Sequence, residues 1–393
     1  MSQKWSILFV LSTGLLVVGS TFISPLWVAA GKVAYPCLFR SLEERTECYE
    51  DTLPDLFPEF SVREIFSFVK SAQKIEPALA DCHFVAHELG QRVVRNNPKR
   101  WADFIKEEIP GSICAGGYVH GLTIAAYDHE GLSDKEIERE LPVFRKACEG
   151  MRFNDRLSCV HGLGHMLYYI TGGDVRRSLP LCDRVTSESI VDQSFTDARR
   201  CYTGVVMMLF FSFIDPEWEP SKLYSLNREN VQDFCDTFPR PAHRGACMRG
   251  SWPIFSEVIE TGGGIDVFCA NQPDTHETEW CYAKMFLAVG WKNVGELNDI
   301  QRICSGVSSA WRKSCHMHTQ REILAQGGIS GGLPKAIELC ELYGLADRNS
   351  CYAILAESSG RYTGTSQNDV PRKEFCEKLP EAWRDMCLSA PER

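Results

Sequence analysis

The chain has 393 residues, of which 44% are hydrophobic and 24% charged, so it is long enough to bury a large core. Its formal net charge of −10 at pH 7 argues against a nucleic-acid partner, because such a partner binds to a basic surface. The 18 cysteines are even in number and contain no CxxC motif, which excludes the signatures of thioredoxin-like redox proteins, zinc ribbons and c-type haem attachment.

The N-terminus is typical of an exported protein. Lys4 precedes an apolar run from Trp5 to Ala30 that contains no charge, and the small residues at 28–30 stand before Gly31 like a signal-peptidase site. The run is also long enough to span a bilayer. We therefore expect residues 1–30 to be a signal peptide or an N-terminal membrane anchor. In either case the rest of the chain is expected to be extracytoplasmic, periplasmic or extracellular, and either membrane-anchored or secreted.

The cysteines form two interleaved series along the chain. One series ends helix-like segments, and the other opens the apolar segment that follows: Cys37, Cys148, Cys182, Cys235, Cys269, Cys304, Cys340 and Cys376, then Cys48, Cys159, Cys201, Cys247, Cys281, Cys315, Cys351 and Cys387. Seven of these eight pairs have ten or eleven residues between their members, and Cys82 and Cys114 remain as a ninth pair. The spacing predicts nine local disulfides in an oxidising compartment.

The same spacing reveals an internal repeat. From Cys247 onward the second cysteines recur every 34 to 36 residues, which is the length of a two-helix repeat unit. Alternating apolar and polar runs long enough for strands are absent. We therefore predict an all-α fold of disulfide-stapled two-helix repeats stacked as a solenoid, either open or curved into a ring. Residues 31–180 would form histidine-rich N-terminal helical repeats, and residues 181–393 C-terminal helical repeats.

An arginine recurs three residues before the second cysteine in six units: Arg45, Arg156, Arg244, Arg312, Arg348 and Arg384. A structural role, as a salt bridge or a contact to a carbonyl, is the simpler interpretation. A row of ligand-binding guanidinium groups is the alternative that the spacing allows.

The sharpest chemical signal lies in three cysteine-led segments, CHFVAHELG from Cys82, CAGGYVHGL from Cys114 and CVHGLGHML from Cys159. Two of them carry histidines four residues apart, which lie on one face of a helix. The five histidines of the three segments are His83, His87, His120, His161 and His165. Later units do not keep them, although His316 and His318 form a second, weaker group.

Two HxxxH pairs and a fifth histidine predict a transition-metal site, because zinc, copper and iron all accept imidazole ligands. Glu88, beside His87, is the candidate general base, and Asp128 and Glu130 are further candidate oxygen ligands or bases. Neighbouring helices pack about 8–10 Å apart. A site shared by the first and third of these helices would therefore require a tightly curved stack, and two separate sites are the alternative.

Three functions fit this pattern. The first is a metal-dependent enzyme of unknown substrate, in which the ion activates water or oxygen and a carboxylate moves protons. The second is a non-catalytic scaffold that binds a protein or peptide, with the histidines lining its groove. The third is metal storage or sensing without chemistry. Convergence of the histidine side chains within about 5 Å in a pocket would favour the enzyme.

The repeated C…HG segments and the HGxGH segment at 161–165 resemble those of uncharacterised exported proteins rich in cysteine and histidine. This resemblance implies an exported helical-repeat protein and no particular activity. The period alone is similar to that of tetratricopeptide and Sel1-like repeats, whose residue signatures do not match.

Overall fold

A computed structural model describes residues 25–73, 76–79, 82–95, 97–105, 114, 116–127, 131–151, 153–186, 197–213, 223–293, 295–327, 332–362 and 372–390. These residues form α-helices and short 3-10 helices, and no strand is present among them. The predicted all-α class is therefore confirmed. Contacts divide the chain into two units, Met1–Leu79 and Ala80–Arg393.

The described residues of the first unit form three α-helices, α2 (Pro25–Ala34), α3 (Leu42–Thr52) and α4 (Val62–Ala72), with 3-10 turns at Tyr35–Phe39, Leu53–Leu56 and Pro77–Leu79. Helices α3 and α4 each begin with a capping box, Ser41 with Glu44 and Ser61 with Glu64, which satisfies main-chain N–H groups at the helix start. The first disulfide, Cys37–Cys48, joins the turn before α3 to α3 itself.

Along the second unit, successive helices belong in turn to two rows. These rows are named the outer row and the inner row and are defined by the helices that follow. The outer row consists of α6 (Trp101–Ile105), α8 (Asp134–Ala147), α10 (Val175–Val185), α12 (Val231–Asp236), α14 (Gly262–Ala270), α16 (Leu297–Gly306), α18 (Leu333–Leu342) and α20 (Arg372–Glu377). The inner row consists of α5 (His83–Arg95), α7 (Gly117–Ala126), α9 (Phe153–Ile170), α11 (Asp197–Phe210), α13 (Pro241–Gly250), α15 (Thr275–Lys292), α17 (Ser309–Gly327), α19 (Leu345–Tyr362) and α21 (Glu381–Ser389). Further 3-10 helices lie at Pro98–Arg100, Phe211–Phe213 and Trp252–Glu260.

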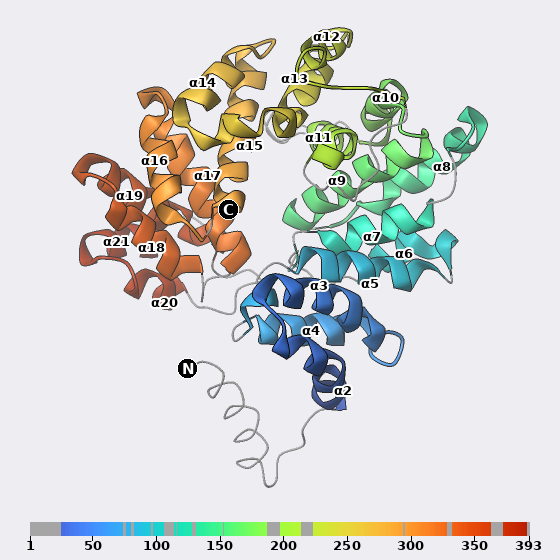
Figure 1. Ribbon diagram of the computed structural model, residues 1–393, viewed down its shortest axis with the longest axis horizontal. Helices are drawn as coiled ribbons and strands as arrows, with labels where there is room; N and C mark the ends of the chain where they lie inside the picture. Colours follow the sequence, from blue (N-terminus) through green and yellow to red (C-terminus); the bar gives the residue numbers. More distant parts are fainter. Residues whose placement is uncertain are drawn as a thin grey trace. The chain divides into compact units, whose positions relative to one another are not determined.

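Each inner helix packs on the next inner helix, from α5 through to α21, and this order can be followed in Figure 1. Most outer helices pack on the inner helix that follows them in the chain. A short helix pair buries little apolar surface alone, so the neighbouring pair completes its core. In the C-terminal part this produces one continuous apolar core from Val258 to Cys387.

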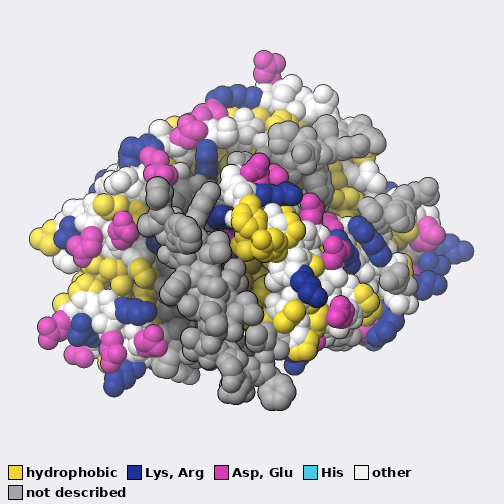
Figure 2. All heavy atoms as spheres, turned by 60° about the horizontal axis from the view of Figure 1, so that its bottom comes forward, with side chains coloured by type: hydrophobic (Ala, Val, Ile, Leu, Met, Phe, Trp, Pro, Cys, Tyr) yellow, Lys and Arg dark blue, Asp and Glu magenta, His cyan; other side chains and the backbone are white. Residues whose placement is uncertain are grey.

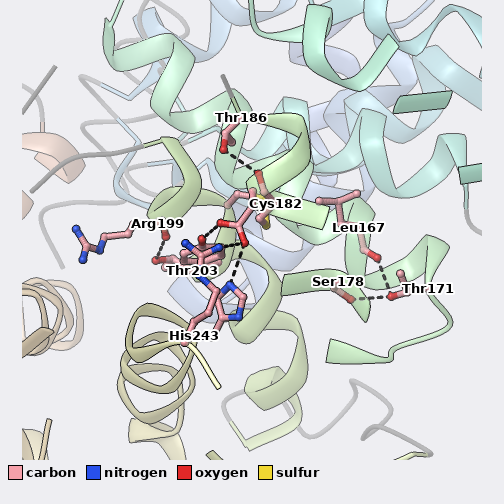
Figure 3. Close-up of a disulfide and its surroundings, with 12 residues drawn as sticks. Leu167, Thr171, Ser178, Cys182, Thr186, Arg199, Thr203 and His243 are labelled. Atoms are coloured by element: carbon pink, nitrogen blue, oxygen red, sulfur yellow. Dashed lines mark hydrogen bonds and ion pairs between the residues drawn. A yellow bond between two sulfur atoms is a disulfide. The ribbon is translucent and has the colours of Figure 1, made fainter. Parts of the chain in front are cut away.

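Nine disulfides staple this arrangement, and every pairing predicted from the cysteine spacing is present. In seven repeats of the second unit the bond joins an outer helix, or the residue directly after it, to the inner helix that follows, as Cys182 of α10 is joined to Cys201 of α11 (Figure 3). The pair Cys82–Cys114 differs, because it joins the segments just before two neighbouring inner helices, α5 and α7. Nine disulfides indicate an oxidising, extracytoplasmic compartment.

The arginine before the second cysteine has a structural role. In three units its Nε donates to the main-chain carbonyl five residues earlier, at 3.0–3.2 Å: Arg312 to Val307, Arg348 to Tyr343 and Arg384 to Leu379. Arg45 instead forms an ion pair with Glu76, and Arg156 one with Asp197. These carbonyls lie in the turn between the two cysteines of a repeat. The arginine therefore provides a hydrogen-bond donor for a main-chain carbonyl at the end of the outer helix.

A tyrosine directly after the second cysteine is another feature that recurs. Its hydroxyl donates to a carboxylate of the preceding outer helix in three repeats, from Tyr202 to Asp183, from Tyr282 to Asp266 and from Tyr352 to Glu341, whereas Tyr49 donates to Glu76, which follows α4. Figure 3 shows similar local bonds around Cys182, where the Thr171 hydroxyl lies between the Leu167 carbonyl and the Ser178 hydroxyl. These hydrogen bonds hold neighbouring helices in a fixed orientation and add to the contribution of buried apolar surface.

The apolar N-terminal run lies almost entirely outside the described residues. Of the helices that the structure describes, none combines the length and apolar character needed to cross a bilayer. The signal peptide and the membrane anchor both stay predictions.

Candidate metal centre

Three of the five predicted histidines converge inside the second unit. His120 of α7 meets His161 and His165 of α9, and their ligating nitrogens all lie within 4.8 Å of one another. The imidazole rings of His120 and His165 are stacked with centroids 4.3 Å apart, and the two Nε2 atoms of α9's pair are 3.1 Å apart. In the described part of the chain this is the one group of three or more possible metal ligands.

The register of α7 on α9 produces this convergence. The Thr123 hydroxyl donates to the Gly162 carbonyl at 3.3 Å, and an added Cβ at Gly162 would lie 3.3 Å from the His120 ring. Gly162 therefore stands opposite His120, and the two histidines of α9 flank this point, one before and one after it. A single histidine on α7 thus completes a triad with a pair spaced by one helical turn on α9.

The other two predicted ligands lie on α5 and do not belong to the triad. The ring of His83, on α5, is 5.1 Å from the His120 ring and 6.5 Å from the His87 ring, measured between centroids. His87 Nδ1 is within hydrogen-bond distance of the Gln91 amide nitrogen, at 3.0 Å. His83 is therefore next to the triad, whereas His87 lies one step further along α5.

Glycines bring α5 and α7 close enough for this contact. An added Cβ at Gly117 would overlap the His83 carbonyl oxygen, and one at Gly121 would overlap the His87 carbonyl oxygen. Only residues without a Cβ allow the two main chains to approach so closely. The glycines beside the histidines in the sequence thus have a packing role, which holds the histidine-bearing helices together.

Glu88 contributes no ligand atom to the triad, and its carboxylate accepts a hydrogen bond from the Gln91 side chain at 2.9 Å. The proposal that Glu88 acts as a base stays a prediction. Asp128 and Glu130, the other candidate oxygen ligands, lie outside the described residues. A site shared by the first and third histidine-bearing helices was expected to require a tightly curved stack. The triad does not require one, because its three histidines come from two adjacent helices, α7 and α9.

Burial sets the protonation state of the triad. His120 and His165 are each 4% exposed. Burial holds the pKa of all three histidines well below the usual range, and neighbouring positive charge, which includes the other histidines, lowers it further. Burial also lowers the pKa of His87 to about 4. The imidazoles are thus neutral at neutral pH, as metal ligation requires.

The triad leaves one buried ring nitrogen without a partner. His120 Nε2 is buried and forms no hydrogen bond with the residues that the structure describes. A buried polar atom left in this state costs about 1–3 kcal/mol, so native structures rarely keep one without a reason. Tetrahedral ligands at about 2.0–2.1 Å from zinc lie about 3.3 Å apart. The 3.1 Å between the two Nε2 atoms of α9 already matches that separation.

Two cationic side chains that the sequence analysis did not single out act on this site. Burial is the largest cause of the lowered pKa of His161. The charge of His120 is the next largest cause, and the charges of Arg200 on α11 and Lys284 on α15 follow it. Lys284 also acts on His165. Neither residue belongs to a recognisable sequence motif. Their effect on α9 depends on how the inner helices pack, which the sequence does not show.

Two surface pockets lie apart from the triad. One has a volume of about 430 Å³ and is bounded by α10, α12 and α13, and the other has about 500 Å³ and lies between α8 and α10. They share Arg176 and Pro180. In the first pocket His243, labelled in Figure 3, has its Nε2 3.3 Å from an Asp183 oxygen. Neither pocket contains a member of the triad.

Comparison of the chain with protein-family models, with curated proteins and with solved structures gave no match. The interpretation of the site therefore depends on its own geometry and chemistry.

Proposed function

We propose that this exported helical-repeat protein binds a transition metal ion, zinc, copper or iron, through His120, His161 and His165. The observation that carries the proposal is the buried Nε2 of His120, which has no partner and lies among ligating nitrogens no more than 4.8 Å apart. Neutral, buried imidazoles from two rigid helices are the donor set that these metals accept.

Three histidines are the ligand number of catalytic rather than structural zinc sites, which usually have four protein ligands. A bound ion of this kind would supply a Lewis acid and a water of lowered pKa at its open position. His83, whose ring lies 5.1 Å from that of His120, is close enough to orient the triad or to bind a molecule beside it. We therefore favour a metal-dependent enzyme of unknown substrate over a storage or sensing protein.

A non-catalytic scaffold that binds a protein or peptide is the second candidate. It is favoured by the two adjoining pockets, where the guanidinium groups of Arg176, Arg177 and Arg184 lie beside carboxylates. A groove with both signs of charge suits a polar peptide segment better than a small apolar ligand. This function would not depend on the histidines.

Elemental analysis of the full chain, oxidised and without a histidine tag, tests the proposal. We expect about one equivalent of metal per chain, and its loss in the His161→Gln/His165→Gln variant. The matched control is His316→Gln/His318→Gln, which also replaces two buried histidines of an inner helix but lies outside the triad. Intact-mass measurement of nine disulfides would verify that each variant folds.

Absence of metal from the wild-type chain, even after each of the three metals has been supplied, would refute the metal centre. Equal loss of metal from the control variant would show that the triad is not the site. Retention of metal by the triad variant would have the same meaning.

A further inference from the structure

Helix α2 places the predicted signal-peptidase site inside the folded first unit. The helix spans Pro25–Ala34, so the bond between Ala30 and Gly31 lies within it. α2 contacts α3, α4 and the 3-10 helices at Tyr35–Phe39 and Leu53–Leu56. The residues on both sides of this bond therefore belong to one packed element.

One face of α2 is part of the core of this unit. Leu26 and Ala30 are both buried, and they lie four residues apart on one side of the helix. Cys37 continues this side, is buried as well, and forms the first disulfide with α3. The Trp27 ring packs edge-on against the ring of Phe68 on α4, with centroids 4.9 Å apart. Buried side chains and the disulfide that follows thus hold α2 to its neighbours.

Cleavage after Ala30 would remove most of these contacts. Leu26 and Trp27 would be lost with it, and only residues 31–34 of α2 would remain. So short a remnant cannot persist as a helix, because the first four N–H groups of a helix have no intrahelical partner. The buried ring of Phe68 would lose the ring that packs against it. The packing therefore favours a mature chain that keeps α2 whole.

The opposite face of the same segment is exposed and largely hydrophobic. Trp27 and Val28 of α2 and Tyr35 and Phe39 of the next 3-10 helix are between 44% and 67% exposed. Lys32 is exposed too, and positions 28, 32, 35 and 39 recur at the spacing of one helix face. The rings of Tyr35 and Phe39 meet edge to face, with centroids 5.1 Å apart. These five residues are named the exposed stripe below.

The sequence around the exposed stripe is apolar and cationic. Residues 5–24, directly before α2, contain no charged residue, and about 20 mainly apolar residues are enough to span a bilayer as a helix. The first acidic residue of the chain is Glu43, whereas Lys4, Lys32 and Arg40 come before it. This start contrasts with the net charge of −10 for the whole chain. It suits the hydrocarbon and the phosphate groups of a lipid bilayer.

Hydrophobic side chains reach the surface elsewhere too, as the face drawn in Figure 2 shows, and singly they are ordinary. The exposed stripe differs in composition and position. Tryptophan and tyrosine beside lysine and arginine are the residues that membrane proteins place at the level of the lipid headgroups, next to a spanning segment. Their rings are apolar, and their N–H and O–H groups can still meet water or phosphate.

We propose that residues 1–30 stay on the mature protein as a membrane anchor, and that the exposed stripe rests on the headgroups of the same membrane. The partner is thus a phospholipid bilayer, with the rings of the stripe at headgroup level and Lys32 and Arg40 at lipid phosphates. The proposal concerns the first unit alone and does not depend on the metal centre.

Mass spectrometry of the full chain tests the anchor. The chain is produced with its own N-terminus in a host that exports it, and the membrane fraction is washed with alkaline carbonate before purification. We expect the washed membranes to retain a chain of 44.3 kDa whose N-terminal peptides cover residues 5–30. A new N-terminus anywhere in residues 5–35, above all at Gly31, would overturn the proposal. Release of the whole chain by carbonate would overturn it as well.

Quenching of tryptophan fluorescence by brominated lipid tests the contact with headgroups. The full chain is reconstituted into vesicles of equal parts phosphatidylcholine and phosphatidylglycerol, with or without bromine on the acyl carbons nearest the headgroup. The signal of Trp27 is the difference between the wild-type chain and Trp27→Phe, a variant that keeps a ring against Phe68. We expect bromine to reduce this signal about two-fold or more, because the indole lies at headgroup level.

Trp291→Phe is the matched control, because Trp291 is 45% exposed and Trp27 44%, but Trp291 lies on α15 of the second unit. Bromine should leave the signal of Trp291 unchanged. A second variant, Tyr35→Ser/Phe39→Ser, keeps Trp27 and should weaken the quenching, since the stripe loses two of its rings. This variant also keeps the test valid if Trp27→Phe fails to fold.

The outcomes separate the two halves of the proposal. Equal quenching of Trp27 and Trp291 would overturn a specific contact between the exposed stripe and lipid. An unquenched Trp27 in a chain that retains residues 1–30 would overturn the lipid contact, assign the stripe to a partner other than the bilayer, and leave the anchor standing.

Discussion

His120 is the residue on which the candidate centre depends most. It is the contribution of α7 to a triad otherwise supplied by α9, and it touches the rings of His83, His161 and His165. Its sequence context, GGYVHG, predicted a functional histidine but not its partners. The partners follow from the register of α7 on α9, which is set by Gly162 and Thr123.

His316 provides a pH-dependent contribution to stability. Its side chain is buried at 1% exposure, both ring nitrogens lack partners, and its ring lies 4.3 Å from that of Tyr343. Burial lowers its pKa to about 4, with Arg312 adding to the effect and Asp347 opposing it. Between about pH 4 and the unfolded value of about 6.5, the unfolded chain binds a proton that the folded chain does not.

Stability should therefore fall as the pH falls through this window. The contribution of His316 alone is about 3 kcal/mol at most. The His316→Phe variant keeps a ring against Tyr343 but cannot titrate, so its free energy of unfolding should decrease less between pH 7 and pH 4.5 than that of the wild-type chain. Urea unfolding at both pH values measures the difference. An identical decrease in the two proteins would show that His316 does not titrate as expected.

At the scale of elements, the pair α5 and α7 is the closest helix contact of the site. Gly117 and Gly121 are four residues apart on α7 and meet the carbonyls of His83 and His87 on α5. The same small-residue spacing allows close helix approach in other proteins. The glycines therefore determine how near His83 comes to His120.

The Gly121→Ala variant tests this packing. The new methyl group would overlap the His87 carbonyl oxygen, so the helices must separate, at a cost of about 1–3 kcal/mol. We expect a lower urea midpoint together with weaker metal binding. Gly263→Ala is the control, since it lies in helix α14 and an added Cβ there meets no atom within 4 Å.

The control substitution should be neutral or stabilising, because alanine favours a helix by up to about 1 kcal/mol relative to glycine. If Gly121→Ala were as stable as the control and bound metal equally well, close packing of α5 on α7 would not determine the geometry of the site.

At the scale of the whole molecule, the disulfides make each repeat a local unit. Eight of the nine bonds close loops with sequence separations of 11 to 19 residues, and only Cys82–Cys114, at 32, is longer. In the chain-entropy model a loop of this size contributes about 3 kcal/mol. Stability in such an array is roughly a sum of repeat terms and nearest-neighbour terms.

Removal of single staples should therefore have local effects. Replacement of both Cys376 and Cys387 by serine should cost about 2–4 kcal/mol of local stability without a change in metal content. The same replacement at Cys148 and Cys159 should cost a similar amount and also weaken metal binding, because Cys159 is two residues before His161. Hydrogen exchange and elemental analysis measure the two effects. Loss of metal from the first variant would show long-range coupling along the row.

The fold class, the repeat and the disulfide pairing could be predicted from the sequence, because they depend on local periodicity: a helix pair of fixed length, and two cysteines that in most units are separated by ten or eleven residues. The histidines could be predicted too, four of them from HxxxH pairs on one helix face and His120 from its matching place after a cysteine. The packing between helices sets which three of them converge and which one lies beside them. Those outcomes depend on glycine contacts and helix register between units, and no local pattern encodes the distance between side chains on different helices.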